Sequence, residues 1–177
     1  MIRYYVTDRR QADVLACAAR AVREGIDMIQ VREKDLPSRE LFDLVSRIRD
    51  LCAGTRTRVL VNDRLDIALA ARVVGLHLPS NGLPPDRVRP FVKLLGVSTH
   101  TIQEATEAEQ AHADFIVFGP VFDSPGKTPV GLEPLRKVIS SVKIPVIAIG
   151  GITSANADQV LHAGAAGIAG IRLFQMD

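Results

Sequence analysis

Three polar side chains occupy alternate positions directly after a short apolar run. Gln30, Arg32 and Lys34 are each separated by one residue, and side chains two apart in an extended chain point to the same side. A guanidinium can hold phosphate oxygens through two parallel hydrogen bonds, and an ammonium adds a point charge. The pattern favours an anion site over a solvated strand end.

A second polar group ends the apolar run at residues 58–62. Asn62 and Asp63 come immediately before a stretch that carries Leu65 and Ile67. An aspartate in this position is suited equally to capping the next helix and to binding a cation. Both interpretations of Asp63 stay open at this point.

The next two apolar runs contain an imidazole and a cluster of hydroxyls. His77 lies inside its run, which is typical of an interior histidine with its hydrogen bonds satisfied. The following run ends in Ser98, Thr99, His100 and Thr101, which together offer several donors. Thr101 is also expected to cap the helix that follows.

The longest irregular stretch, residues 119–131, is rich in glycine and proline and is expected to lie over the active site as a lid. It carries Ser124 and Lys127, a hydroxyl and an ammonium. Lys127 is equally compatible with a functional role and with exposure to solvent.

Two further anion-binding candidates follow the last two apolar runs. Gly150 and Gly151 allow backbone N–H groups to approach an anion closely, and Arg172 adds a cation after the final run. A tight turn without a ligand is the alternative for the glycine pair.

All of these residues require a scaffold, and the apolar runs predict one. We expect eight strands, at residues 3–7, 28–32, 58–62, 75–78, 94–98, 115–118, 146–149 and 167–171. Amphipathic segments lie between them, with Ser38, Thr101 and Ser154 as expected N-caps and Gly164 as a helix stop.

Strands that are apolar on both faces and alternate with helices predict a parallel sheet buried on both sides. Eight such units can close into an α/β (β/α)8 TIM barrel, whose active site lies at the carboxyl ends of the strands. An open doubly wound sheet is disfavoured because Thr7, Asp8, Arg9 and Arg10 follow the first strand in place of a glycine-rich turn.

The chain is expected to be one domain over residues 1–177, a compact barrel that lacks the final helix, because the sequence stops soon after the eighth strand. The outer face of the first and last strands would then be uncovered. This predicts a homodimer or a higher homo-oligomer.

Composition narrows the class of partner. With 22 Lys and Arg against 20 Asp and Glu, the net charge of +2 gives no field that would attract nucleic acid or an anionic membrane. Cys17 and Cys52 lack the spacing of metal or redox sites and are expected to be buried, reduced thiols. No apolar run is long enough to span a bilayer and no leader is visible, so we expect a cytoplasmic protein.

Six strings of residues together resemble one enzyme superfamily, that of thiamin phosphate synthase and its sister, the thiazole tautomerase. They are Tyr-Val-Thr-Asp (5–8), Gln-Val-Arg-Glu-Lys-Asp (30–35), Val-Asn-Asp-Arg (61–64), Gly-Val-Ser-Thr-His-Thr (96–101), Gly-Pro-Val-Phe (119–122) and Ile-Pro-Val-Ile-Ala-Ile-Gly-Gly-Ile (144–152). The similarity runs through essentially the whole chain in order.

The resemblance implies small phosphorylated substrates, namely a hydroxymethylpyrimidine diphosphate and a thiazole phosphate, which the synthase joins with release of pyrophosphate. The resemblance also implies that Arg32, Lys34, Lys127 and Asn62 bind the pyrophosphate and that Asp63 binds Mg²⁺. Ser98 and Ser124 would donate hydrogen bonds near the reacting groups. Gly150, Gly151 and the backbone near Ile171 would bind the thiazole phosphate. Ser98 and Lys127 would be the catalytic pair.

This sequence departs from the family pattern at three places. Pro79, Ser80, Asn81 and Gly82 stand where the synthase carries its second Mg²⁺ carboxylate, so the metal site would be weakened or absent. The string Leu-Pro-Ser at 78–80 resembles the tautomerase.

At the other two places, Pro120 resembles the synthase rather than the tautomerase, which has a histidine there, and Arg172 replaces a serine usual in both. Three functions therefore remain open: a synthase, a tautomerase that would need His77 or His100 as its acid or base, and a non-catalytic thiamin phosphate sensor.

Overall fold

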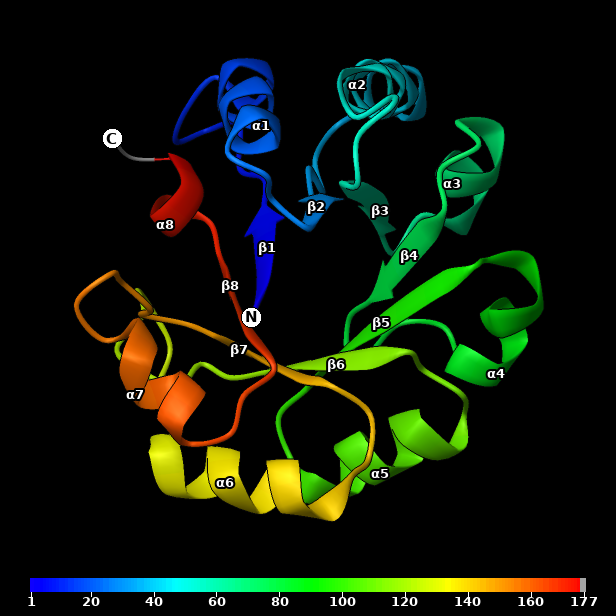
Figure 1. Ribbon diagram of the computed structural model, residues 1–177. Coiled ribbons are helices and arrows are strands. Elements are labelled where there is room, and N and C mark those ends of the chain that lie inside the picture. The colour runs from blue at the N-terminus through cyan, green and yellow to red at the C-terminus, as the bar shows by residue number, and fades with distance from the viewer. Residues whose placement is uncertain (176–177) are drawn as a thin grey trace.

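Eight short parallel strands close into a barrel in the computed structural model, which describes residues 1–175 (Figure 1). Each strand pairs with the next along the chain, and the last pairs with the first. The strands are β1 (Ile2–Val6), β2 (Met28–Val31), β3 (Arg58–Asn62), β4 (Gly75–Leu78), β5 (Leu94–Thr99), β6 (Phe115–Phe118), β7 (Val146–Ile149) and β8 (Gly167–Gly170). All eight predicted strands are confirmed, with ends that differ by at most one residue.

Helices connect the strands and form the outer layer around them (Figure 1). They are α1 (Val14–Arg23), α2 (Ser38–Leu51), α3 (Leu65–Ala70), α4 (Pro85–Val88) with a 3₁₀ turn at Arg89–Phe91, α5 (Ile102–Gln110), α6 (Leu132–Ser141), α7 (Ala157–His162) and α8 (Arg172–Gln175). Within the described residues, no helix has the length and apolar character needed to cross a membrane.

The Val, Ile and Leu runs of the strands are explained by burial on both faces. One set of side chains fills the inside of the barrel, and it comprises Tyr4, Met28, Leu60, Leu94, Phe115, Val117, Ile147 and Ala169. The alternate set, such as Tyr5, Ile29 and Val61, packs outward against the helices. The interior of the barrel is therefore a packed core and not a pore.

Local signals at helix ends were predicted with mixed success. Thr101 caps α5, since its hydroxyl accepts from the Glu104 N–H, and Gly164 follows α7 with a φ of +102°. Ser38 is the first residue of α2 rather than its cap, because Pro37 holds the cap position. The prediction for Ser154 was also wrong, since α7 begins only at Ala157.

The expectation that no helix follows the eighth strand was wrong. Helix α8 forms one turn beside α1 (Figure 1), and Phe174 and Gln175 are buried there. The outward-facing Tyr5 of β1 is 0% exposed, with its ring 6.2 Å from that of Phe174. The uncovered face from which a homo-oligomer was predicted is thus closed by the chain itself at these residues.

Candidate active site

The predicted site residues all lie at or just beyond the carboxyl ends of the strands. Barrel closure brings these ends to one mouth, although the residues span positions 30 to 172 of the chain. Parallel strands all end on the same side, so closure alone gathers the candidates.

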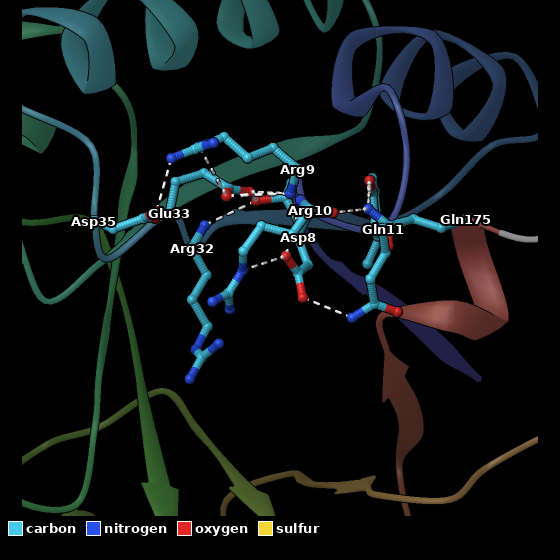
Figure 2. Close-up of polar contacts among 10 residues, drawn as sticks. Asp8, Arg9, Arg10, Gln11, Arg32, Glu33, Asp35 and Gln175 are labelled. Atoms are coloured by element: carbon cyan, nitrogen blue, oxygen red, sulfur yellow. Dashed lines mark hydrogen bonds and ion pairs between the residues drawn. The ribbon is translucent and has the colours of Figure 1, made fainter. Parts of the chain in front are cut away.

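At the end of β2, the predicted alternation holds for Gln30 and Arg32. Gln30 is buried and points into the barrel, Arg32 is half-buried, and Lys34 lies exposed in the turn that follows. Figure 2 shows the Arg32 side chain extending away from its neighbours. Among the described residues its guanidinium has no hydrogen-bond or ion-pair partner, so this cation is available to a ligand.

Glu33 has a structural role that the sequence analysis did not predict. Its side chain is only 2% exposed, and its carboxylate accepts the Thr7 hydroxyl at 2.6 Å and the Arg9 N–H at 3.1 and 3.2 Å (Figure 2). The Thr7 hydroxyl oxygen in turn accepts the Arg32 N–H at 2.9 Å. Glu33 therefore ties the β1–α1 loop to the backbone that carries Arg32.

The same loop is bound from the other side by the last described residue. Gln175 Nε2 donates to the Asp8 carbonyl at 3.0 Å and to the Tyr5 hydroxyl at 3.1 Å. The carboxylate of Asp8 pairs with Arg10 and Gln11 (Figure 2). Helix α8 is thus part of the framework of the mouth.

After β3, Asn62 is half-buried and Asp63 is exposed in the left-handed region, with a φ of 62°. Arg64, not Asp63, holds the N-cap position of α3, so the capping interpretation of Asp63 was wrong. A Cβ added at Gly82 would lie 3.1 Å from Asp63 Oδ1, which places this carboxylate beside the 79–82 loop.

His77 is an interior histidine with both ring nitrogens hydrogen-bonded, as predicted. It is 1% exposed, with Nδ1 3.1 Å from the Tyr4 hydroxyl and Nε2 2.9 Å from Ser98 Oγ. Burial lowers the pKa of His77 to about 3, and the nearby Arg32 charge acts in the same direction. The ring is therefore neutral at physiological pH.

This buried ring predicts a loss of stability in acid. The pKa of His77 falls from 6.5 to about 3 on folding, so between these values the unfolded chain binds a proton that the folded protein does not. The free energy of unfolding should fall by about 2 kcal/mol from pH 7 to pH 5 on account of this group. Urea unfolding at both pH values should show this fall in the wild type and a smaller fall in His77→Gln. An equal fall in the free energy of unfolding in the two proteins would contradict the prediction.

Ser124 and Lys127 are brought together by a tight turn in the lid. The Lys127 N–H donates to the Ser124 carbonyl at 3.0 Å, with Pro125 and Gly126 between them and Gly126 at a φ of +73°. This matches the preference of a type II turn for proline followed by glycine. Lys127 is exposed, and its role stays a prediction.

The base of the lid is fixed to the end of β7. Val121 and Phe122 N–H groups donate to the carbonyls of Ile149 and Gly150 at 2.8 and 3.0 Å. A Cβ at Gly150 would lie 2.3 Å from Pro120 Cβ, and one at Gly151 would lie 2.4 Å from the Asp123 carbonyl oxygen. Close packing by the lid therefore requires both glycines, whether or not they also bind a phosphate.

The last predicted group follows β8. The Ile171 carbonyl accepts the N–H groups of Phe174 and Gln175, and Arg172 begins α8 with its side chain exposed. Within residues 1–175, no three His, Cys, Asp or Glu side chains form a group that could hold a metal ion by themselves. Cys17 and Cys52 are free and buried, as expected.

Comparison with known proteins shows which family the chain belongs to. The model of the family described as thiamine monophosphate synthase matches residues 3–174. The chain belongs to this family. It is accordingly an enzyme of the transferase class.

Individual relatives of the synthase family agree over most of the chain. The putative thiamine-phosphate synthase of Geobacter sulfurreducens is 44% identical over 176 residues, covering 94% of this chain and 83% of that protein. The thiamine-phosphate synthase of Roseiflexus sp. is 38% identical, with 94% and 75% covered.

A solved structure shows the same fold in this family. Thiamine phosphate pyrophosphorylase from Pyrococcus furiosus superposes with a TM-score of 0.90 at 37% identity, covering 97% of this chain and 85% of that one.

Proposed function

We propose that the protein is a thiamin phosphate synthase that joins hydroxymethylpyrimidine diphosphate to thiazole phosphate and releases pyrophosphate. The observation that carries this proposal is the guanidinium of Arg32, unpaired among residues 1–175, at the mouth of a barrel whose sequence matches the synthase family over residues 3–174. We also propose a cytoplasmic location, in keeping with two free thiols.

The chemistry requires positive charge around a departing diphosphate. As the C–O bond to the pyrimidine methylene breaks, negative charge accumulates on the pyrophosphate oxygens, and fixed cations stabilise it most. Arg32 and Lys34 would supply this charge from β2 and Lys127 from the lid, while Asn62 donates a hydrogen bond from β3. The thiazole nitrogen then forms the new C–N bond with the cationic methylene.

The second substrate would bind at the carboxyl ends of β7 and β8. Gly150, Gly151 and the backbone near Ile171 would accept the thiazole phosphate, and the exposed Arg172 adds a charge there that serine would not. Ser98 and Ser124 would orient the reacting groups between the two anion sites.

The residues present fit a Mg²⁺ ion that is bound mainly by the substrate. Mg²⁺ is commonly held by one or two carboxylates together with phosphate oxygens and water, and Asp63 is the one site carboxylate that the family pattern retains. When bound, Mg²⁺ would neutralise charge on the diphosphate.

The direct test is release of pyrophosphate from the two substrates, with and without Mg²⁺. We expect metal-dependent release by the wild type and a loss of at least about tenfold in Lys127→Ala, because one cation of the anion site is removed. Folded protein that binds thiamin phosphate but releases no pyrophosphate would contradict the proposal and favour a sensor.

Asp63 should control how much Mg²⁺ the reaction needs. In Asp63→Asn, half-maximal pyrophosphate release should require about tenfold more Mg²⁺, while the rate at saturating Mg²⁺ falls less, because removal of a metal ligand chiefly weakens metal binding. A Mg²⁺ titration of both proteins measures this. Asp66→Asn, on the exposed start of α3, is the control and should leave the titration unchanged.

The structure gives no support to His77 as the acid or base of a tautomerase. The ring is 1% exposed with a pKa of about 3, whereas an efficient acid–base group has a pKa near the working pH.

A further inference from the structure

A chain of buried hydrogen bonds crosses the barrel interior beneath the mouth. Gln30 Nε2 donates to the Tyr4 hydroxyl oxygen at 3.0 Å, that hydroxyl lies 3.1 Å from His77 Nδ1, and His77 Nε2 lies 2.9 Å from Ser98 Oγ. The four residues come from β2, β1, β4 and β5. Only Ser98, at the end of the chain of bonds, is partly exposed.

The proton content of this network is fixed. Burial raises the pKa of Tyr4, so its hydroxyl keeps its proton, and His77 is neutral, with one donor and one acceptor nitrogen. Two arrangements of hydrogens then remain, and they differ in which nitrogen of His77 carries the proton.

The bond from Gln30 decides between the two arrangements. If Nδ1 carried the proton, the Tyr4 oxygen would accept from both Gln30 and His77, and its own buried hydroxyl hydrogen would have no partner in the network. If Nε2 carries it, Tyr4 donates to Nδ1 and the Nε2–H donates to Ser98 Oγ, so the buried donors of Tyr4 and His77 both have acceptors. A buried donor without an acceptor is costly, so the Nε2–H form is selected.

Packing holds the His77 ring in the orientation that these hydrogen bonds require. His77 lies between the rings of Tyr4 and Phe115, with centroid distances of 5.8 and 6.0 Å. A Cβ at Gly96 would lie 2.3 Å from Phe115 Cζ and 2.9 Å from His77 Nδ1, so glycine is what leaves room for both rings.

We propose that Tyr4 and His77 are positioning residues that make Ser98 a hydrogen-bond donor toward the substrate. His77 Nε2–H donates to Ser98 Oγ, which leaves the serine hydroxyl hydrogen free to point into the mouth. Ser98 therefore recognises an acceptor atom, such as a ring nitrogen of the pyrimidine, and discriminates against a group that only donates. The substrate part of this inference rests on the proposed function; the direction of the hydrogen bonds does not.

The first test reads the tautomer directly and needs no activity. Long-range ¹H–¹⁵N correlation spectra of ¹⁵N-histidine-labelled full chain should show His77, assigned by its loss in His77→Gln, as neutral with the proton on Nε2. In Tyr4→Phe, which removes the donor to Nδ1, the signal should shift toward a mixture. A proton on Nδ1, or a charged ring, in the wild type would overturn the proposal.

The second test asks whether Tyr4 acts through Ser98. We expect Tyr4→Phe and Ser98→Ala each to lower kcat/KM for hydroxymethylpyrimidine diphosphate about tenfold, with the KM for thiazole phosphate unchanged, and the double variant to be no worse than Ser98→Ala. Multiplied losses in the double variant would overturn the proposal.

A packing control separates positioning from general disturbance of the barrel. Phe115→Leu alters the contact with both rings but removes no hydrogen bond, so it should lower the melting temperature while leaving kcat/KM within about twofold. An equal loss of activity in Phe115→Leu would mean that Tyr4 acts by packing alone. If the wild type forms no thiamin phosphate, the proposed function fails, and the spectra alone decide the direction of the hydrogen bonds.

Discussion

Arg32→Ala should lower kcat/KM for pyrophosphate release by about 100-fold or more, because it removes the one cation at the mouth that the protein holds half-buried and unpaired among the described residues. Its charge acts at short range on the developing negative charge of the leaving group. Steady-state kinetics with a coupled pyrophosphate assay would measure the loss.

Two variants give this result its meaning. Arg58→Ala removes an equal charge from an exposed position at the start of β3, on the far side of the barrel, and should leave the rate within about twofold. Arg32→Lys keeps the charge but not the bidentate geometry and should recover only part of the activity. Similar losses in Arg32→Ala and Arg58→Ala would mean that net charge, and not a local contact, matters.

Glu33→Ala should have the largest effect on stability, lowering the free energy of unfolding by about 2–3 kcal/mol, because the Thr7 hydroxyl and the Arg9 N–H would lose their buried acceptor. Activity should fall as well, since Thr7 also accepts the N–H of Arg32. Urea unfolding and pyrophosphate release would report the two effects separately.

The matched control is Asp35, a second carboxylate that contacts Arg9. Asp35 pairs with the Arg9 guanidinium at 2.7 Å, but its side chain is 57% exposed. Asp35→Asn should therefore cost less than about 1 kcal/mol and leave activity intact. A cost in Asp35→Asn as large as that in Glu33→Ala would show that the loop is held by the surface ion pair rather than by the buried carboxylate.

The fold was predictable because it depends on local patterns of apolar residues that can be read from the sequence alone. Strands buried on both faces need continuous Val, Ile and Leu runs, and those runs identified all eight strands. Helix α8 escaped prediction because a single turn is too short to show helical periodicity. Its burial depends on Gln175 reaching Tyr5, 170 residues earlier in the chain.

The positions of some candidate site residues were also predictable, while their binding roles stay predictions. Gln30 and Arg32 followed from alternation along one strand. The roles of Tyr4 and Glu33 did not, because their partners are set by barrel closure: Tyr4 meets His77 from 73 positions away, and Glu33 meets Thr7 from 26. One feature of the sequence did set Glu33 apart: it alternates with the predicted donors Arg32 and Lys34, so its side chain points away from theirs.

The contact between α8 and the β1–α1 loop also constrains how the chain is made. Strand β1 leaves the ribosome before the other seven strands of the barrel, yet one of its two partners, β8, and the Gln175 side chain that binds its loop are synthesised after them. One edge of β1 must therefore stay unpaired through nearly the whole of translation, and unpaired edges attract other strands. Nascent chains arrested before β8 should accordingly engage chaperones and aggregate, whereas the same chains extended through Gln175 should not.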